Sequence, residues 1–189
     1  MSDYTTKKAV ELIDNEKHLQ EKIDFLFSII RRYDSYIGTT NVKAGLMLSF
    51  MGTIIVFLAT RSISIDPASK SLGYIYYAAI FFSIITSLLS TAASITLLRV
   101  IFPNTKNKTI TNEKSLIFFG DVSAYNATSY YEKIKKSSME SLLQDLSAQT
   151  YILADIVNEK FRILKIAMLI TYTVVPLFAI SLILLTVVG

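Results

Sequence analysis

Three long runs of uncharged residues dominate this chain and restrict what it can fold into. They are Ala44–Thr60, Ser71–Leu98 and Ile166–Gly189. A helix crosses the hydrocarbon layer of a bilayer with about 20 mainly apolar residues, which is close to the length of these runs. The chain has 189 residues, 52 % of them hydrophobic, and its mean hydropathy is +0.46. These values are typical of an integral membrane protein, so we expect three membrane-spanning helices.

The placement of basic residues predicts the orientation of these helices. Lysine and arginine are frequent before the first run and between the second and third runs. The short connection at residues 61–72 carries only Arg61 and Lys70, and residues 166–189 carry none. Short basic segments stay on the cytoplasmic side of a membrane. We therefore expect a cytoplasmic N-terminus, a cytoplasmic central segment and an external C-terminus.

The segment before the first run predicts a long helix over residues 5–37. Its apolar residues alternate at spacings of three and four, which is the pattern of a coiled-coil seam with Glu16 as a polar member. We expect the sequence Ile37-Gly38-Thr39-Thr40 to break this helix, and Thr40 or Asn41 to cap the first span. The seam residues are Ala9, Leu12, Glu16, Leu19, Ile23, Leu26, Ile30, Tyr33 and Ile37.

A second seam follows the central polar segment. Ser129 and Glu132 have the spacing of a capping box, and no proline occurs from Tyr130 until Pro176. We therefore expect a helix that runs from this point into the third span without a stop. Its seam residues are Leu142, Leu146, Gln149, Leu153, Ile156, Lys160, Ile163 and Ala167.

Together these patterns predict an all-α membrane protein with three transmembrane helices and a cytoplasmic helical, coiled-coil bundle. Three spans cannot enclose a pore alone and two seams need partners, so we expect a homo-oligomer in the lipid bilayer. The predicted parts are a cytoplasmic N-terminal helix (1–40), a transmembrane hairpin (41–102), a cytoplasmic loop with a long helix (103–165) and a third transmembrane helix (166–189).

Small residues recur at helical spacing inside two of the runs. Gly45, Ser49 and Thr53 repeat every four residues in the first. Such residues let helices approach closely in lipid, and a serine stripe could instead line a polar path once subunits assemble. Both interpretations apply to the stripe in the second run, which consists of Ala79, Ser83, Ser87, Ser90 and Ser94.

The residues expected of an enzyme are missing from the sequence. The chain has no cysteine, one histidine and no glycine-rich phosphate loop, so we expect no catalytic site, no metal site and no resident cofactor. The three runs contain no ionisable residue, which argues against a proton-coupled transporter. Sensing, assembly or breaching of the bilayer are the remaining roles.

Several short motifs occur in an order that resembles a known family. They are Asn41-x-Lys43-Ala44, Arg99 to Pro103, Phe118-Phe119-Gly120 with Asp121, and Asp145 to Lys160. With the three spans, they make the chain from Tyr33 onward similar to the Pycsar transmembrane effectors of bacterial anti-phage defence. Asn41 departs from the aspartate that we expect at this position in the family.

The resemblance implies a function in the bacterial inner membrane. A partner cyclase would make a cyclic pyrimidine mononucleotide, cyclic UMP or cyclic CMP. The effector would bind this activating ligand, assemble and impair the membrane, so that infection is abortive. No role in binding DNA or RNA is implied. The candidate ligand-binding residues are Asn41, Lys43, Arg99, Phe118, Phe119, Asp121, Gln149, Asn158 and Lys160.

Each candidate residue also has a structural interpretation. Lys43 and Arg99 could anchor spans to lipid phosphates, Phe118 and Phe119 could form an apolar plug, and Gln149 and Lys160 could set the register of a seam. Two other functions are compatible with the sequence: a membrane-permeabilising toxin without a ligand, and a membrane-anchored coiled-coil scaffold.

Overall fold

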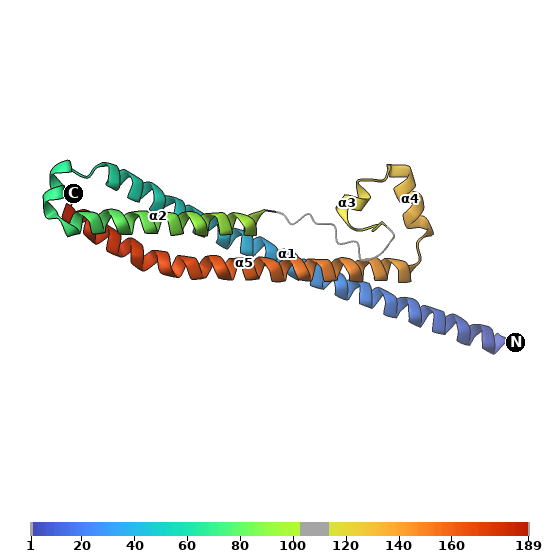
Figure 1. Ribbon diagram of the computed structural model, residues 1–189. Coiled ribbons are helices and arrows are strands. Elements are labelled where there is room, and N and C mark those ends of the chain that lie inside the picture. Colours follow the sequence, from blue (N-terminus) through green and yellow to red (C-terminus); the bar gives the residue numbers. More distant parts are fainter. Residues whose placement is uncertain (1, 103–113, 189) are drawn as a thin grey trace. The chain divides into compact units, whose positions relative to one another are not determined.

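The computed structural model describes residues 2–102 and 114–188, without the side chains of residues 2–13 and Pro67. All of its regular elements are helices, as Figure 1 shows. Two predicted span ends, Pro103 of the second span and Gly189 of the third, lie outside the described residues. The side chains of the seam residues Ala9 and Leu12 also lie outside them. The helices are α1 (Ser2–Ile63), η1 (Pro67–Leu72), α2 (Tyr74–Ile101), α3 (Phe119–Val122), α4 (Ala127–Lys136) and α5 (Met139–Val188).

Three of these helices, α1, α2 and α5, are long and apolar enough to cross a membrane. They contain the first run, the second run from Tyr74 onward and the third run as far as Val188, so the predicted all-α membrane protein with three spans is confirmed. Only 22 %, 28 % and 17 % of their most apolar windows are buried within the chain. The remaining apolar surface needs lipid or another protein chain, because water would not solvate it favourably.

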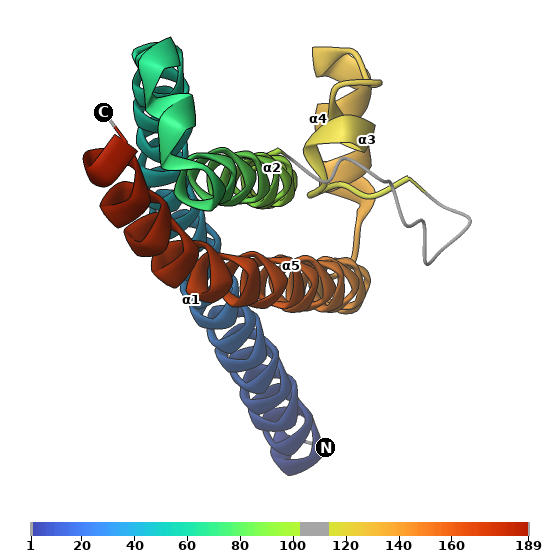
Figure 2. The same cartoon turned by 60° about the vertical axis from the view of Figure 1, so that its left-hand side comes forward.

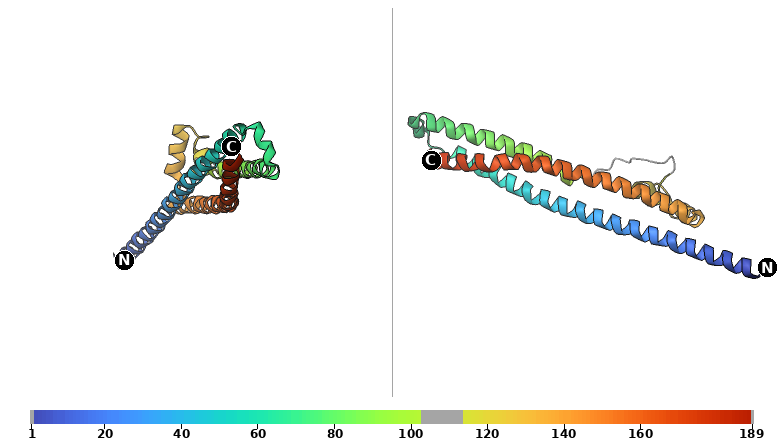
Figure 3. Two further views of the ribbon diagram at one scale, coloured as in Figure 1. Left: turned by 90° about the vertical axis from the view of Figure 1, so that its left-hand side faces the viewer. Right: turned by 90° about the horizontal axis from the view of Figure 1, so that it is seen from below.

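The chain divides into two compact units. One unit, here called the polar unit, consists of Met1–Tyr36 and Asn104–Val157. The other, here called the membrane unit, consists of Ile37–Pro103 and Asn158–Gly189 and contains the uncharged runs. The helices α1 and α5 each contribute to both units, and each is drawn as an unbroken ribbon in Figures 2 and 3.

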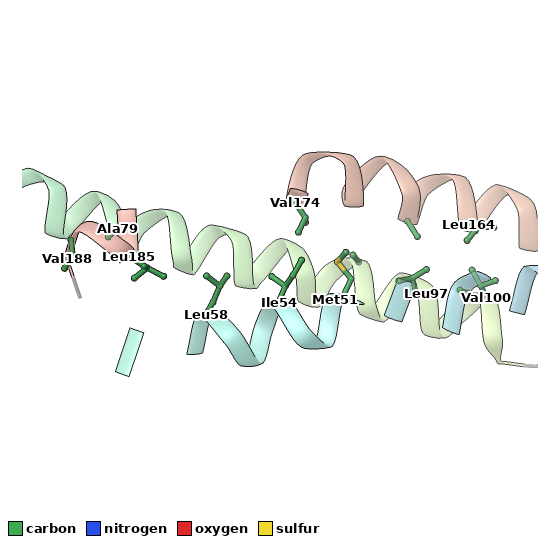
Figure 4. Close-up of a cluster of buried hydrophobic side chains, with 13 residues drawn as sticks. Met51, Ile54, Leu58, Ala79, Leu97, Val100, Leu164, Val174, Leu185 and Val188 are labelled. Atoms are coloured by element: carbon green, nitrogen blue, oxygen red, sulfur yellow. The ribbon is translucent and has the colours of Figure 1, made fainter. Parts of the chain in front are cut away.

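The membrane unit has one apolar core to which α1, α2 and α5 all contribute. Figure 4 shows these side chains, which are inaccessible or nearly so. The Phe57 ring also meets the Phe178 ring edge to face, with the centroids 5.7 Å apart. The labelled core residues are Met51, Ile54 and Leu58 of α1, Ala79, Leu97 and Val100 of α2, and Leu164, Val174, Leu185 and Val188 of α5.

The connection between α1 and α2 is closed by hydrogen bonds. The Asp66 carboxylate accepts from the Ala68 amide at 2.8 Å and so caps η1. Gly73 ends η1 with a φ of 58°, a backbone conformation that favours glycine. Within the same unit, the Ser69 hydroxyl donates to the Val188 carbonyl at 2.6 Å. This bond satisfies one of the carbonyls that the end of α5 leaves free.

The small-residue stripe of α2 is packed inside the membrane unit. Ala79, Ser83 and Ser90 are buried. Beside them, Thr86 is buried and its hydroxyl lies 3.2 Å from the Ser181 hydroxyl of α5. The burial of the stripe against helices of its own chain favours the close-packing interpretation over the polar path.

The polar unit follows the predicted seams. Along α1, Ile23 is buried and Leu19, Leu26 and Ile30 are half-buried, whereas Glu16 is exposed. Along α5, every seam member from Leu142 to Ile156 is buried or half-buried. The alternation of three and four therefore marks the less exposed face of both helices.

The predicted helix break at residues 37–40 is wrong, because α1 continues without interruption from Ser2 to Ile63. A glycine inside a helix costs only about 1 kcal/mol relative to alanine. Continued backbone hydrogen bonding through Gly38 and the burial of Thr40 outweigh that cost. No proline occurs here to force an end.

The prediction of one uninterrupted helix from Ser129 into the third span is also wrong, because two helices occupy this segment. The cap of α4 is Asn126, whose side chain accepts from the Ser129 amide at 2.7 Å. This helix ends at Lys136, and α5 begins at Met139. The Ser138 hydroxyl accepts from the Ser141 amide at 3.1 Å, so Ser138 starts the new helix as a side-chain cap.

Substitutions of Ser90 test whether the small-residue stripe of α2 is packed within a single chain. Its hydroxyl is buried and has no hydrogen-bond partner among the described residues. We expect Ser90→Ala to leave stability unchanged or raise it, because an unpaired polar atom is removed. Ser90→Leu should lower the free energy of unfolding by about 1–3 kcal/mol through overpacking. Unfolding in detergent micelles measures both, and full tolerance of leucine would contradict the packing.

Candidate functional site

A buried lysine joins three helices in the membrane unit. Lys160 of α5 is 7 % exposed. Its ammonium group donates to the Asn41 side-chain oxygen of α1 at 3.0 Å and to the Val100 carbonyl oxygen of α2. Two candidates that the sequence singled out separately, Asn41 and Lys160, are thus in direct contact.

The position of the Val100 carbonyl explains why a lysine can be buried here. Val100 lies in the last turn of α2, which ends at Ile101. Carbonyls at a helix end lack intrahelical donors and carry the negative end of the helix dipole. The Lys160 ammonium satisfies such a carbonyl, and the Asn41 amide oxygen supplies a second acceptor. We call these three groups the Lys160 junction.

The other candidates of the membrane unit do not share this contact. Lys43, Arg99 and Asn158 are exposed. Arg99 lies in the last turn of α2, where a positive charge is favourable beside the helix dipole. The exposure of Lys43 and Arg99 suits both interpretations offered by the sequence, an anchor to lipid phosphates and a contact with an anionic ligand.

In the polar unit, a serine turn gathers two other candidates. The Ser115 amide donates to the Asp121 carboxylate at 2.9 Å, and the Gln149 side chain donates to the Ser115 hydroxyl at 3.2 Å. That hydroxyl also accepts from the Phe118 amide at 2.9 Å. Asp121 therefore closes the turn before α3, and Gln149 holds this turn against α5.

The paired phenylalanines form only part of the expected apolar plug. The Phe118 ring is half-buried, but Phe119 is 71 % exposed. Their centroids are 4.8 Å apart. A Cβ atom at Gly120 would lie 2.6 Å from Phe118 Cε1, so glycine leaves room for that ring. The Phe119 ring remains available to a partner, a ligand or lipid.

A cavity of about 350 Å³ lies close to the serine turn, within the polar unit. Its wall comes from the segment before α3, the end of α4 and the first turns of α5. The side chains of Lys114 and Lys133 give it positive charge, and Asp145 gives it negative charge. The full lining is Lys114, Ser115, Leu116, Lys133, Ser137, Ser141, Gln144 and Asp145.

Reasoning from the sequence missed this cavity. Lys133 is one of three lysines in the last turn of α4, and nothing in the sequence distinguishes it from Lys135 or Lys136. Asp145 was noted only as the start of a motif. Its carboxylate accepts from the Leu116 amide at 2.8 Å across 29 residues, a contact without any local sequence signal.

The candidate residues therefore fall into two groups, one in each unit. Asn41, Lys43, Arg99, Asn158 and Lys160 belong to the membrane unit. Phe118, Phe119, Asp121 and Gln149 belong to the polar unit. The described residues contain no group of three or more histidine, cysteine, aspartate or glutamate side chains that could hold a metal ion.

Comparison with known proteins gives two matches in sequence. The family model PycTM, described as the Pycsar effector protein domain, matches residues 25–187. The Pycsar effector protein EcPycTM of Escherichia coli is 32 % identical over 151 residues, which cover 75 % of this chain and 78 % of that protein. No solved structure is significantly similar.

The Lys160 junction yields a prediction about stability. Replacing Lys160 by methionine leaves a buried carbonyl and a half-buried amide oxygen without their donor, so we expect a loss of about 1–3 kcal/mol in the free energy of unfolding. Hydrogen exchange should also accelerate at the last turn of α2. The matched control is Lys165→Met, because Lys165 is exposed on the same helix. Equal effects of the two substitutions would contradict the junction's role.

Proposed function

The chain belongs to the Pycsar effector family, and we propose that it binds a cyclic pyrimidine mononucleotide and then impairs the inner membrane by assembling into oligomers. As a member of that family it is a transmembrane effector of anti-phage defence. The activating ligand, cyclic UMP or cyclic CMP, comes from a partner cyclase. Loss of the membrane barrier then makes the infection abortive.

One observation carries this proposal. The family match over residues 25–187 includes most of the polar unit and all three spans. The polar unit, to which we assign ligand binding, and the membrane unit, to which we assign membrane impairment, therefore occur together in one family domain. The polar unit supplies a cavity with basic side chains, and the membrane unit supplies apolar surface far in excess of its own core.

We further propose that the polar unit lies in the cytoplasm, where a cyclase product would be found. Its segments carry most of the lysine and arginine residues, which favours retention on the cytoplasmic side. The C-terminus and η1 then face outward. Tyr74 and Tyr77, exposed at the start of α2, would lie at the outer interface, where amphipathic aromatic rings are favoured.

An unpartnered face of α1 supports assembly. Ser49 and Thr53 are exposed there, and Cβ atoms added at Gly45 or Gly52 would meet nothing within 4 Å. The Ser49 and Thr53 hydroxyls donate to the carbonyls four residues earlier, so they bring no unpaired donor into lipid. Faces of small residues permit close helix contact between chains in a bilayer.

Leakage from liposomes tests the function. We expect the purified full-length protein, inserted into liposomes, to release a trapped dye when cyclic UMP or cyclic CMP is added, and not without them. Cyclic AMP and cyclic dinucleotides serve as controls. Leakage without any nucleotide would identify an autonomous toxin. Absence of leakage with every nucleotide, in protein shown to be folded and inserted, would favour the scaffold.

The α1 face gives a separate prediction about assembly. Gly52→Leu adds bulk where one chain has free space, so each chain should remain as stable as the wild type. Close contact between chains should be blocked, and we expect ligand-induced cross-linking and dye release to fall several-fold. Ala92→Leu on α2 is the matched control, because it adds the same bulk at another exposed position. Wild-type cross-linking of the Gly52 variant would exclude this face.

A further inference from the structure

We infer that the cavity between the segment before α3, the end of α4 and the start of α5 is the binding site for the cyclic nucleotide. This inference rests on the proposed function for the class of ligand. The site itself follows from the cavity, from its charges and from the hydrogen bonds that hold its walls. Its lining includes Lys133, Lys114 and Gln144.

The walls are fixed by hydrogen bonds between segments distant in sequence. Leu116 donates its amide to Asp145 of α5 at 2.8 Å and accepts at its carbonyl from the Tyr130 hydroxyl of α4 at 2.8 Å. Ser115 is tied to Gln149 of α5 at 3.2 Å. One short segment thus bridges two helices, so the cavity exists before a ligand arrives and little ordering is needed on binding.

The net charge of the cavity lining suits an anion with one negative charge. The lining contains two lysines and one aspartate, which leaves a net charge of +1. Asp145 already accepts a hydrogen bond from the Leu116 amide. Within the described residues, the Lys133 ammonium has no ion pair, and Lys114 contacts only the Tyr125 ring, 5.5 Å from its centroid. The cyclic phosphodiester of a 3′,5′-mononucleotide carries one negative charge, which these two ammonium groups can bind.

The size of the cavity favours one nucleotide unit. Pockets for small ligands span about 300–1,000 Å³, and this cavity of about 350 Å³ lies near the lower limit. A cyclic dinucleotide has two bases, two sugars and two phosphate charges. Its two phosphate charges would exceed the net positive charge of the lining.

Gln144 can bind the edge of a nucleobase. Its side chain has no hydrogen-bond partner in the part of the chain that the structure describes. An amide offers one acceptor oxygen and a donor NH₂ group side by side. Uracil presents an N–H donor beside a carbonyl, and cytosine an NH₂ group beside a ring nitrogen. Gln144 can pair with either edge. The Ser141 hydroxyl, which also belongs to the lining, can bind a sugar or phosphate oxygen.

Equilibrium binding of cyclic UMP and cyclic CMP to the full-length protein in lipid nanodiscs tests the site. We expect Lys133→Gln and Lys114→Gln each to weaken binding about tenfold, which is the loss of one partly exposed charge-assisted contact. Lys133→Arg should retain most of the affinity. Gln144→Leu should weaken nucleotide binding without changing the weak competition by inorganic phosphate. The matched control is Lys135→Gln, on the same helix turn but outside the lining.

The binding results distinguish a failure of the proposed site from a failure of the proposed function. If the wild type binds a cyclic pyrimidine nucleotide and both lysine variants bind it as tightly as Lys135→Gln does, the site is overturned and the proposed function stands. If the wild type binds neither nucleotide, both are overturned. All variants change exposed side chains and should keep the wild-type circular dichroism spectrum, so weaker binding cannot be attributed to unfolding.

Discussion

Helix ends near the hydrocarbon layer need hydrogen-bond donors for their carbonyls, and the Lys160 ammonium supplies one to the Val100 carbonyl. A helix that ends near hydrocarbon leaves carbonyls without donors, and each unsatisfied group is costly there. Lys160 satisfies the end of α2, and Ser69 does the same for the end of α5 at Val188. Between the ends, span hydroxyls such as those of Thr53 and Ser83 donate to carbonyls four residues earlier. These bonds pair polar groups that would otherwise face the apolar core or lipid.

The spans were predictable because charge is excluded from hydrocarbon so strongly that uncharged runs are a clear signal. The seams were predictable for a related reason, since spacing alone decides which face of a helix is buried. Helix ends were harder to place. Gly38 costs too little to end α1, and the cap of α4 is Asn126 rather than Ser129. Such choices depend on differences of about 1 kcal/mol, which a sequence pattern does not resolve.

The candidate site was predictable only in part. Asn41 and Lys160 were both selected, yet their contact joins residues 119 positions apart and has no local signature. The cavity was missed for the same reason. Its lysines lie in a chain rich in exposed lysine, and what distinguishes Lys133 is the segment that Asp145 and Tyr130 hold beside it. Chemistry can be read from single residues, whereas a site also requires the tertiary contacts that bring them together.

Two helices run through the boundary between the two units. The boundary between the units falls after Tyr36 in α1 and after Val157 in α5, and both helices cross it without a break. Sharp helix kinks usually need proline, a bulge or an inserted group, and neither crossing contains a proline. Backbone hydrogen bonding therefore continues from one unit into the other along both helices. Residues of α1 before Tyr36 and the core residues Met51 and Ile54 therefore belong to one continuous helix.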